Sequence, residues 1–156
     1  MLVVIIAAEI STALREGRGV VALEPTMISH GLPSESSARV AREIEAAVRK
    51  RGAVPATIAI IDGQVRIGLA DSALDRIATD ATVIKSSIRD LGSVMASRTL
   101  GATTVASTAY LAHRTGIRVF ATGGRGGSAV EPIRASTSQP TCLHSPTPLW
   151  RLSAQA

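Results

Sequence analysis

The chain has 156 residues, which is enough for one domain with a buried core and too few for two. Apolar residues make up 46% of it and charged residues 19%, which excludes a disordered chain, and aromatic residues at 2% leave Ala, Val, Ile and Leu to build the core. A net charge of +5 fits an anionic partner, either nucleic acid or a phosphorylated metabolite, and the scarcity of aromatic side chains that stack on bases favours the metabolite.

The single cysteine, Cys142, excludes an intramolecular disulfide and a cysteine-rich metal site. The apolar opening "MLVVIIAA" is too short to cross a bilayer and has no basic residues before it, so it predicts neither a membrane anchor nor a signal peptide. We therefore expect a cytoplasmic protein with no membrane partner.

Helical periodicities and aliphatic runs alternate along the chain, which predicts an α/β fold. The expected helices cover residues 7–16, 34–51, 71–79, 89–100 and 103–116, with the last two joined at Gly101. The expected strands cover residues 19–24, 55–61, 64–70, 81–87 and 117–124, with a turn at residues 62–63.

Three polar features each follow an aliphatic strand: Glu24, Lys85 and the loop "TGGRGG" at residues 122–127. If the strands are parallel neighbours, their carboxyl ends gather at one edge of the sheet, where open α/β sheets bind ligands. This arrangement predicts a single site built from all three features.

Glu24 ends the strand in "VVALEPTMISHGLP", residues 20–33. A carboxyl group in an apolar wall has a raised pKa, which suits a general acid near neutral pH. The alternative is an acid that caps or salt-bridges a loop.

Lys85, in "IKSSIRDL", is placed either to bind a phosphate or carboxylate beside a helix N-terminus or to pair with Asp90. The glycines of "TGGRGG" allow backbone amides to approach an anion closely, but the spacing is neither that of a Walker loop nor that of a dinucleotide fingerprint. These glycines are Gly123, Gly124, Gly126 and Gly127.

The hydroxyl-rich segment "GATTVAST", residues 101–108, either caps and packs a helix or lines a pocket. His30 and His113 lack the spacing of metal ligands, and Met27 and Met95 are expected in the core.

The quoted segments, together with "RGAVPATIAIIDGQVRIGL", "GATTVASTAYLA" and "GIRVFATGGRGG", occur in the order and spacing of pseudouridine-5'-phosphate glycosidases. The chain resembles that family over residues 7–127. The resemblance implies a manganese-dependent homotrimer with an α/β/α fold that reversibly cleaves pseudouridine 5'-phosphate to uracil and ribose 5-phosphate. It also implies a covalent lysine adduct and a glutamate that donates a proton.

By position, the resemblance implies that Glu24 is the proton donor and that Lys85 and Val105 contact the substrate. Two residues depart from the family pattern. Pro25 replaces a Ser or Thr beside the acid, and Arg125 stands where the glycine loop usually has an aliphatic residue.

Residues 128–156 form the largest departure, because they are rich in Ser, Thr and Pro and show no helical or strand period. We expect two parts: residues 1–127 as the N-terminal part of the family's domain, and residues 128–156 as an aberrant tail of low order. The family motifs "FDISADL", with the manganese-binding aspartate, and "CAGVKS", with the covalent lysine, do not occur in this sequence. The resemblance therefore implies a truncated α/β/α domain that binds no manganese and has no turnover.

A shift of reading frame explains the tail. When the codons of residues 136–148 are read one base earlier, from the last base of the Ala135 codon, they can encode F-D-I-S-A-D-L-P-A-L-A-H-T, which contains the family motif, if third bases are chosen to suit. This predicts a one-base frameshift near Ser128, in the gene or in its sequence record.

Three functions remain as alternatives. The first is a truncated and inactive copy of the family enzyme. The second is a non-catalytic module that binds sugar phosphates through Lys85 and the glycine loop or binds other molecules. The third, a basic nucleic-acid binder, rests on charge alone and ranks last.

Overall fold

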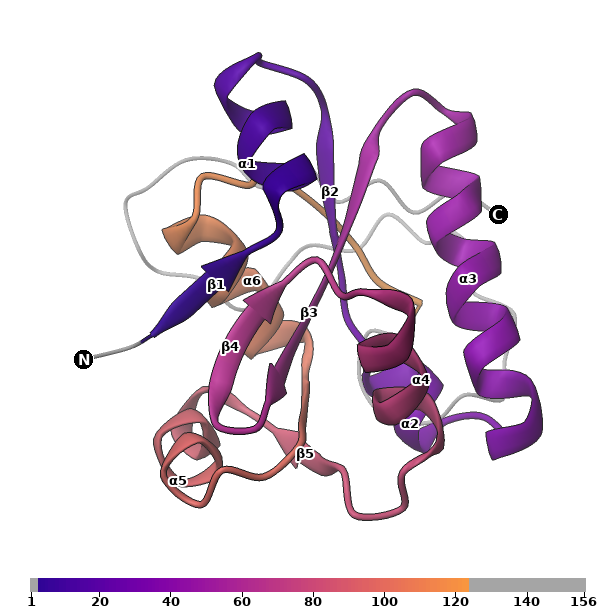
Figure 1. Cartoon of the computed structure of the whole chain (residues 1–156), viewed down its shortest axis with the longest axis vertical. Coiled ribbons are helices and arrows are strands. Elements are labelled where there is room, and N and C mark those ends of the chain that lie inside the picture. The colour runs from indigo at the N-terminus through magenta and orange to yellow at the C-terminus, as the bar shows by residue number, and fades with distance from the viewer. Residues whose placement is uncertain (1–2, 124–156) are drawn as a thin grey trace, which may run out of the picture.

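The computed structural model describes residues 3–123 as a three-layer α/β/α arrangement (Figure 1). Helices α1, α5 and α6 supply core residues on one face of the sheet, whereas α2, α3 and α4 pack together on the other face. The α/β fold class predicted from the sequence is confirmed. The predicted low-order tail, residues 128–156, lies outside the described residues.

The strands are short except for the central one. They are β1 Val4–Ile6, β2 Val20–Leu23, β3 Val54–Ile61, β4 Gln64–Ile67, β5 Ile84–Ser86, β6 Gly101–Thr103 and β7 Val119–Ala121. The helices are α1 Ala8–Arg15, α2 Thr26–His30, α3 Ser34–Lys50, α4 Asp71–Thr79, α5 Leu91–Ala96 and α6 Val105–Arg114, with a 3-10 turn at Ile88–Asp90.

The long strand β3 organises the sheet, whose main order is β1-β4-β3-β2-β7. Its first half pairs in parallel with β2, and β2 pairs in parallel with β7. Its second half pairs antiparallel with β4 and with β6, and β6 pairs in parallel with β5. All eight residues of β3 are buried, as its largely aliphatic sequence predicts, and Thr57 is the polar side chain among them.

Strands β2 and β6 approach each other from opposite directions beside β3. Leu23, the last residue of β2, pairs with Thr57, while Ala102 of β6 pairs with Ala59 two residues further along β3. The hydroxyl of Thr26 links the two ends by donating to the carbonyl of Thr103 at 2.6 Å. The carboxyl ends of β2 and β6 therefore meet next to the middle of β3.

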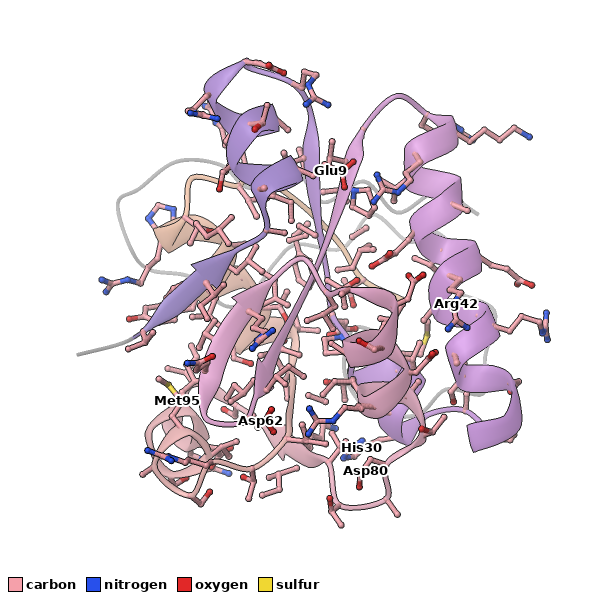
Figure 2. The ribbon with its side chains drawn as sticks, viewed as in Figure 1. Glu9, His30, Arg42, Asp62, Asp80 and Met95 are labelled. Carbon is pink, nitrogen blue, oxygen red and sulfur yellow. The ribbon has the colours of Figure 1, made fainter. Side chains whose placement is uncertain are left out.

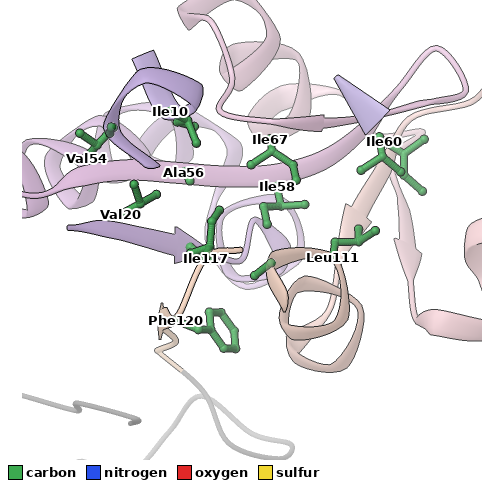
Figure 3. Packing of buried hydrophobic residues seen from close by; sticks show 14 of the residues in the cluster. Ile10, Val20, Val54, Ala56, Ile58, Ile60, Ile67, Leu111, Ile117 and Phe120 are labelled. Carbon is green, nitrogen blue, oxygen red and sulfur yellow. The ribbon is translucent and has the colours of Figure 1, made fainter. Parts of the chain in front are cut away.

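The larger hydrophobic cluster lies between the sheet and helices α1, α5 and α6 (Figure 3). Ile10 of α1 and Leu111 of α6 contribute fully buried side chains to it, together with Ile58 and Ile60 of β3. Phe120 is the one phenylalanine of the chain, so this core is almost wholly aliphatic, as the composition predicts.

Ion pairs join the helices outside the core, and Figure 2 labels Glu9 and Arg42, one member of each of two such pairs. Arg49 of α3 donates to both carboxylate oxygens of Glu9 on α1, and Arg42 of α3 pairs with Asp75 on α4. Each of these side chains is close to half exposed, so each pair contributes at most about 1 kcal/mol to stability. No helix among the described residues is long and apolar enough to span a membrane.

One sequence-based element prediction is wrong, and one strand was not predicted. Gly101 does not simply join two helices, because residues 101–103 form β6. A Cβ atom at Gly101 would lie 2.6 Å from the Ser86 hydroxyl oxygen and 2.9 Å from Val94 Cγ1, so glycine allows β6 to pack closely there. The apolar opening of the chain contains β1, which pairs with β4.

Candidate active site

Glu24 lies directly after β2 and is half-buried. Since Leu23 of β2 pairs with Ala121 of β7, the next residues on the two strands, Glu24 and Thr122, are also neighbours. The Thr122 hydroxyl donates a hydrogen bond to Glu24 Oε1 at 2.6 Å. The sheet register thus joins two side chains that are 98 residues apart in the sequence.

The surroundings of Glu24 raise the pKa of its carboxyl group. Burial has the largest effect, because it disfavours the charged form, and it outweighs the opposing effects of the Thr122 hydrogen bond and the positive charge of Lys85. A raised pKa keeps a larger fraction of the group protonated near neutral pH than is usual for a glutamate. This is the protonation state that a general acid needs.

Lys85 lies on β5 with an exposed side chain, and its charge acts on Glu24. Asp90, the alternative partner considered from the sequence, accepts a hydrogen bond from the Ser87 backbone N–H at 2.9 Å and lies 3.7 Å from Arg89. Asp90 therefore belongs to the cap of the 3-10 turn, whereas the positive charge of Lys85 acts on Glu24.

Val105 is the first residue of α6, which starts immediately after β6 and its N-cap residue Thr104. Because β6 ends beside the end of β2, the N-terminus of α6 lies in the same region as Glu24. The first amides of a helix lack partners within the helix and favour anions. Val105 therefore lies in the first turn of α6, where a backbone N–H has no acceptor within the helix.

The buried hydroxyls of "GATTVAST" hold elements together. Thr103 donates to the carbonyl of Ile58 and lies 2.8 Å from the Thr108 hydroxyl, and Ser107 donates to the carbonyl of Ser86 at 2.6 Å. These bonds tie β6 to β3 and α6 to β5. Packing between elements accounts for these side chains, whereas the N-cap residue Thr104 makes no side-chain cap hydrogen bond.

Gly123 is the one glycine of "TGGRGG" within the described residues. A Cβ atom there would lie 2.8 Å from Met27 Sδ, so the loop after β7 packs closely on α2. Gly124, Gly126 and Gly127, together with Arg125, lie outside the described residues. The anion-binding role expected for these glycines stays a prediction.

Pro25 fits the backbone at the start of α2. Its φ of −86° is close to the range of proline, and its carbonyl accepts a hydrogen bond from the Ser29 N–H at 3.0 Å. Pro25 is buried and keeps Glu24 at the junction between β2 and α2. The departure from the family pattern is therefore accommodated by the fold.

Manganese, which the resemblance implies, finds no suitable group of ligands in the described part of the chain. Residues 3–123 contain no cluster of three or more His, Cys, Asp or Glu side chains that could hold a metal ion. His30 is exposed, and its Nδ1 lies 2.8 Å from the Ser29 hydroxyl. We accordingly derive no chemical step through a metal.

Sequence reasoning missed Thr122 and Thr26, which both contribute hydrogen bonds at the junction of the strands. Thr122 is the first residue of "TGGRGG", and the glycines of this segment indicate a role for its backbone and not for the Thr122 side chain. The order β2-β7 and its register make Thr122 the neighbour of Glu24, and neither can be read from local sequence.

Glu45 is a second half-buried carboxyl group with a raised pKa. It extends from α3 toward β3, where the Thr57 hydroxyl donates to its Oε1 at 2.6 Å. Burial is the largest cause of the raised pKa, and the Thr57 hydrogen bond opposes it. The folded state therefore binds a proton at Glu45 more tightly than the unfolded chain does.

We expect Glu45→Gln to stabilise the chain at pH 7 relative to wild type, with a difference that shrinks as the pH falls. Glu45 favours folding most when it is protonated, and this contribution is lost as the pH rises through its folded-state pKa. Urea unfolding from pH 4 to pH 7 checks this. A difference in free energy of unfolding that does not change with pH would contradict it.

The fold and the site define an α/β protein with an acid, a lysine and a helix N-terminus at converging strand ends. The family model described as "Indigoidine synthase A like protein" matches residues 9–137, and the chain belongs to this family. The match ends ten residues beyond the boundary predicted at residue 127.

Curated relatives named pseudouridine-5'-phosphate glycosidase support the resemblance predicted from the sequence. The relative from Salinispora tropica is 57% identical over 119 residues, which cover 76% of this chain and 37% of the relative. The relative from Symbiobacterium thermophilum is 54% identical over 119 residues, which cover 76% of this chain and 39% of the relative. The resemblance is confirmed, and the chain spans about two fifths of the length of these relatives.

Solved structures show the same fold. The prealnumycin C-glycosynthase AlnA, crystallised with ribulose 5-phosphate, has a TM-score of 0.69 and 48% identity, over 80% of this chain and 40% of AlnA. The indigoidine synthase A-like protein from Thermotoga maritima has a TM-score of 0.71 and 30% identity, over 81% of this chain and 41% of that protein.

Proposed function

We propose that the described residues form the acid-bearing part of a site that cleaves the C-glycosidic bond of pseudouridine 5'-phosphate to give uracil and ribose 5-phosphate. The half-buried Glu24, with its raised pKa, at converging strand ends carries the proposal. The names of the relatives supply the substrate, and the ribulose 5-phosphate bound to AlnA supports recognition of a sugar phosphate.

In this site Glu24 supplies a proton to the reacting glycoside. A carbon–carbon glycosidic bond leaves the base without a nitrogen lone pair, so departure of uracil requires protonation at carbon. Lys85 and the amides at Val105 are positioned to bind the anionic sugar phosphate, as an exposed ammonium group and a helix N-terminus both favour anions.

The 156-residue chain is expected to bind the sugar phosphate without turning over the nucleotide. The motifs that the resemblance associates with the covalent lysine and the manganese aspartate do not occur in its sequence. A cytoplasmic location, a homotrimeric state and manganese dependence stay predictions from the resemblance. The alternative function is a non-catalytic sugar-phosphate-binding or interaction module, which the exposed Lys85 also fits.

Binding of ribose 5-phosphate to the 156-residue chain tests the proposal. We expect Lys85→Ala to weaken binding by about 10-fold or more in isothermal titration calorimetry, because it removes a charge-assisted contact to the phosphate. Lys50→Ala is the matched control, since Lys50 is an exposed lysine that ends α3 near the opposite ends of the strands. Equal weakening by both variants, or no binding by the wild-type chain, would contradict the proposal.

Sequencing of the coding DNA across codons 120–157 and beyond tests the proposed frameshift. A single missing or extra base, followed by a frame that encodes the family's "CAGVKS", is the expected result. A downstream frame without family sequence would refute the frameshift and would favour the non-catalytic module.

A further inference from the structure

We propose that Thr122 is a positioning residue that holds Glu24 Oε1 and thereby leaves Oε2 as the oxygen that carries the proton. The proposal rests on the proposed role of Glu24 as the acid. It goes further by assigning separate tasks to the two carboxyl oxygens, and it gives the first residue of "TGGRGG" a function that does not depend on the glycines.

The geometry of the pair comes from the sheet. Strands β2 and β7 run parallel, with Val21, Ala22 and Leu23 opposite Val119, Phe120 and Ala121. The next position on each strand carries the acid on one side and the hydroxyl on the other, joined by the bond of 2.6 Å. Sheet pairing thus fixes the distance between the two backbones, whichever rotamers the two side chains adopt.

The backbone is also held on both sides of the pair. Pro25 follows Glu24 and is buried, and its carbonyl accepts the first hydrogen bond of α2. Gly123 follows Thr122 and packs on Met27 so closely that a Cβ atom would lie 2.8 Å from the sulfur. Because Thr122 is β-branched, its own χ1 angle is restricted as well.

The direction of the hydrogen bond distinguishes the two carboxyl oxygens of Glu24. The Thr122 hydroxyl donates, so Oε1 must accept. In a protonated carboxyl group the carbonyl oxygen is the better acceptor, and the proton therefore resides on the other oxygen, Oε2. Oε1 accepts from Thr122 in both the neutral and the ionised state, so loss of the proton requires no rearrangement of the pair.

A purely structural role is the alternative to test against, since the same bond ties β7 to β2. Either kind of bond lowers the pKa of Glu24, because the donor stabilises the ionised carboxylate more than the neutral acid. A bond that only ties the strands together would affect thermal stability and leave kcat of an active enzyme unchanged, whereas a positioning bond affects kcat.

Carbon-13 NMR of the 156-residue chain with labelled glutamate carboxyl groups tests first whether Thr122 holds Glu24. Glu24→Gln identifies the resonance of Glu24. We expect Thr122→Val, which has nearly the same shape and lacks the hydroxyl, to raise the pKa of Glu24 above that of the wild type, and Thr122→Ser to restore it. An unchanged pKa in Thr122→Val, or a failure of Ser to restore it, would overturn the proposal.

A second measurement uses a chimera in which residues 1–127 of this chain precede the C-terminal part of the Symbiobacterium relative. Thr122→Val is expected to lower kcat by about 10- to 100-fold through misplacement of the acid and to move the basic limb of the pH profile upward, with rescue by Thr122→Ser. Unchanged kcat and pH profile in Thr122→Val would overturn the proposal. If Glu24→Gln leaves turnover intact, the proposed function fails, while the NMR titration still decides whether Thr122 holds Glu24.

Discussion

Glu24→Gln is expected to lower kcat for cleavage of pseudouridine 5'-phosphate by about 10²- to 10⁴-fold in the chimera of residues 1–127 with the C-terminal part of the Symbiobacterium relative. Glutamine keeps the shape of the side chain and its oxygen acceptor for the Thr122 hydroxyl, but it has no acidic proton to give. Steady-state assay of uracil release measures the effect.

Glu45→Gln is the matched control in the same chimera. Glu45 is also half-buried, also accepts a threonine hydroxyl and also has a raised pKa, but it reaches β3 from α3, and neither carboxyl group is among the causes of the other's pKa shift. Its replacement is expected to leave kcat within about 2-fold of the parent chimera, because it removes no group from the site. Similar losses for the two variants would show that Glu24 acts through stability and not through chemistry.

Leu111→Ala is expected to lower the free energy of unfolding by about 2–5 kcal/mol. Leu111 is fully buried on α6 and belongs to the core between this helix and the sheet. Truncation removes apolar contacts and leaves a cavity that the aliphatic neighbours fill only in part. Urea unfolding of the 156-residue chain, followed by circular dichroism at 222 nm, measures the change.

The preceding residue on the same helix provides the control. Tyr110 is 37% exposed and makes surface interactions with Arg114, a hydrogen bond of 3.2 Å and a cation–π contact of 5.8 Å to the ring centroid. Tyr110→Ala is expected to cost no more than about 1 kcal/mol. A cost as large as that of Leu111→Ala would indicate a different packing of α6.

Local sequence was sufficient for the parts of the fold whose signals are strong and long. The largely aliphatic run of β3 and the helical period of α3 both predict the observed elements. Strand β6 was missed because three residues carry too little periodicity, and its glycine reads as a helix end. Its conformation depends on contacts with Ser86 and Val94, which the chain brings together only on folding.

The proximity of Glu24 and Lys85 was predicted from the sequence, but the arrangement of their strands was not. Glu24 follows β2, as expected, whereas Lys85 lies within β5 and not after it, and its charge acts on Glu24. Their strands are not parallel neighbours at one edge, since β5 and β6 run against β2, and β6 meets β2 beside the middle of β3. Strand order and register decide this meeting, and the same register brings Thr122 to Glu24.

Uracil release from pseudouridine 5'-phosphate by the chimera and by the 156-residue chain, assayed side by side, tests most directly whether residues 1–127 carry the acid half of a glycosidase site. We predict turnover by the chimera, its loss in the Glu24→Gln chimera, and no turnover by the 156-residue chain. A folded chimera without activity, or turnover by the 156-residue chain itself, would contradict this account.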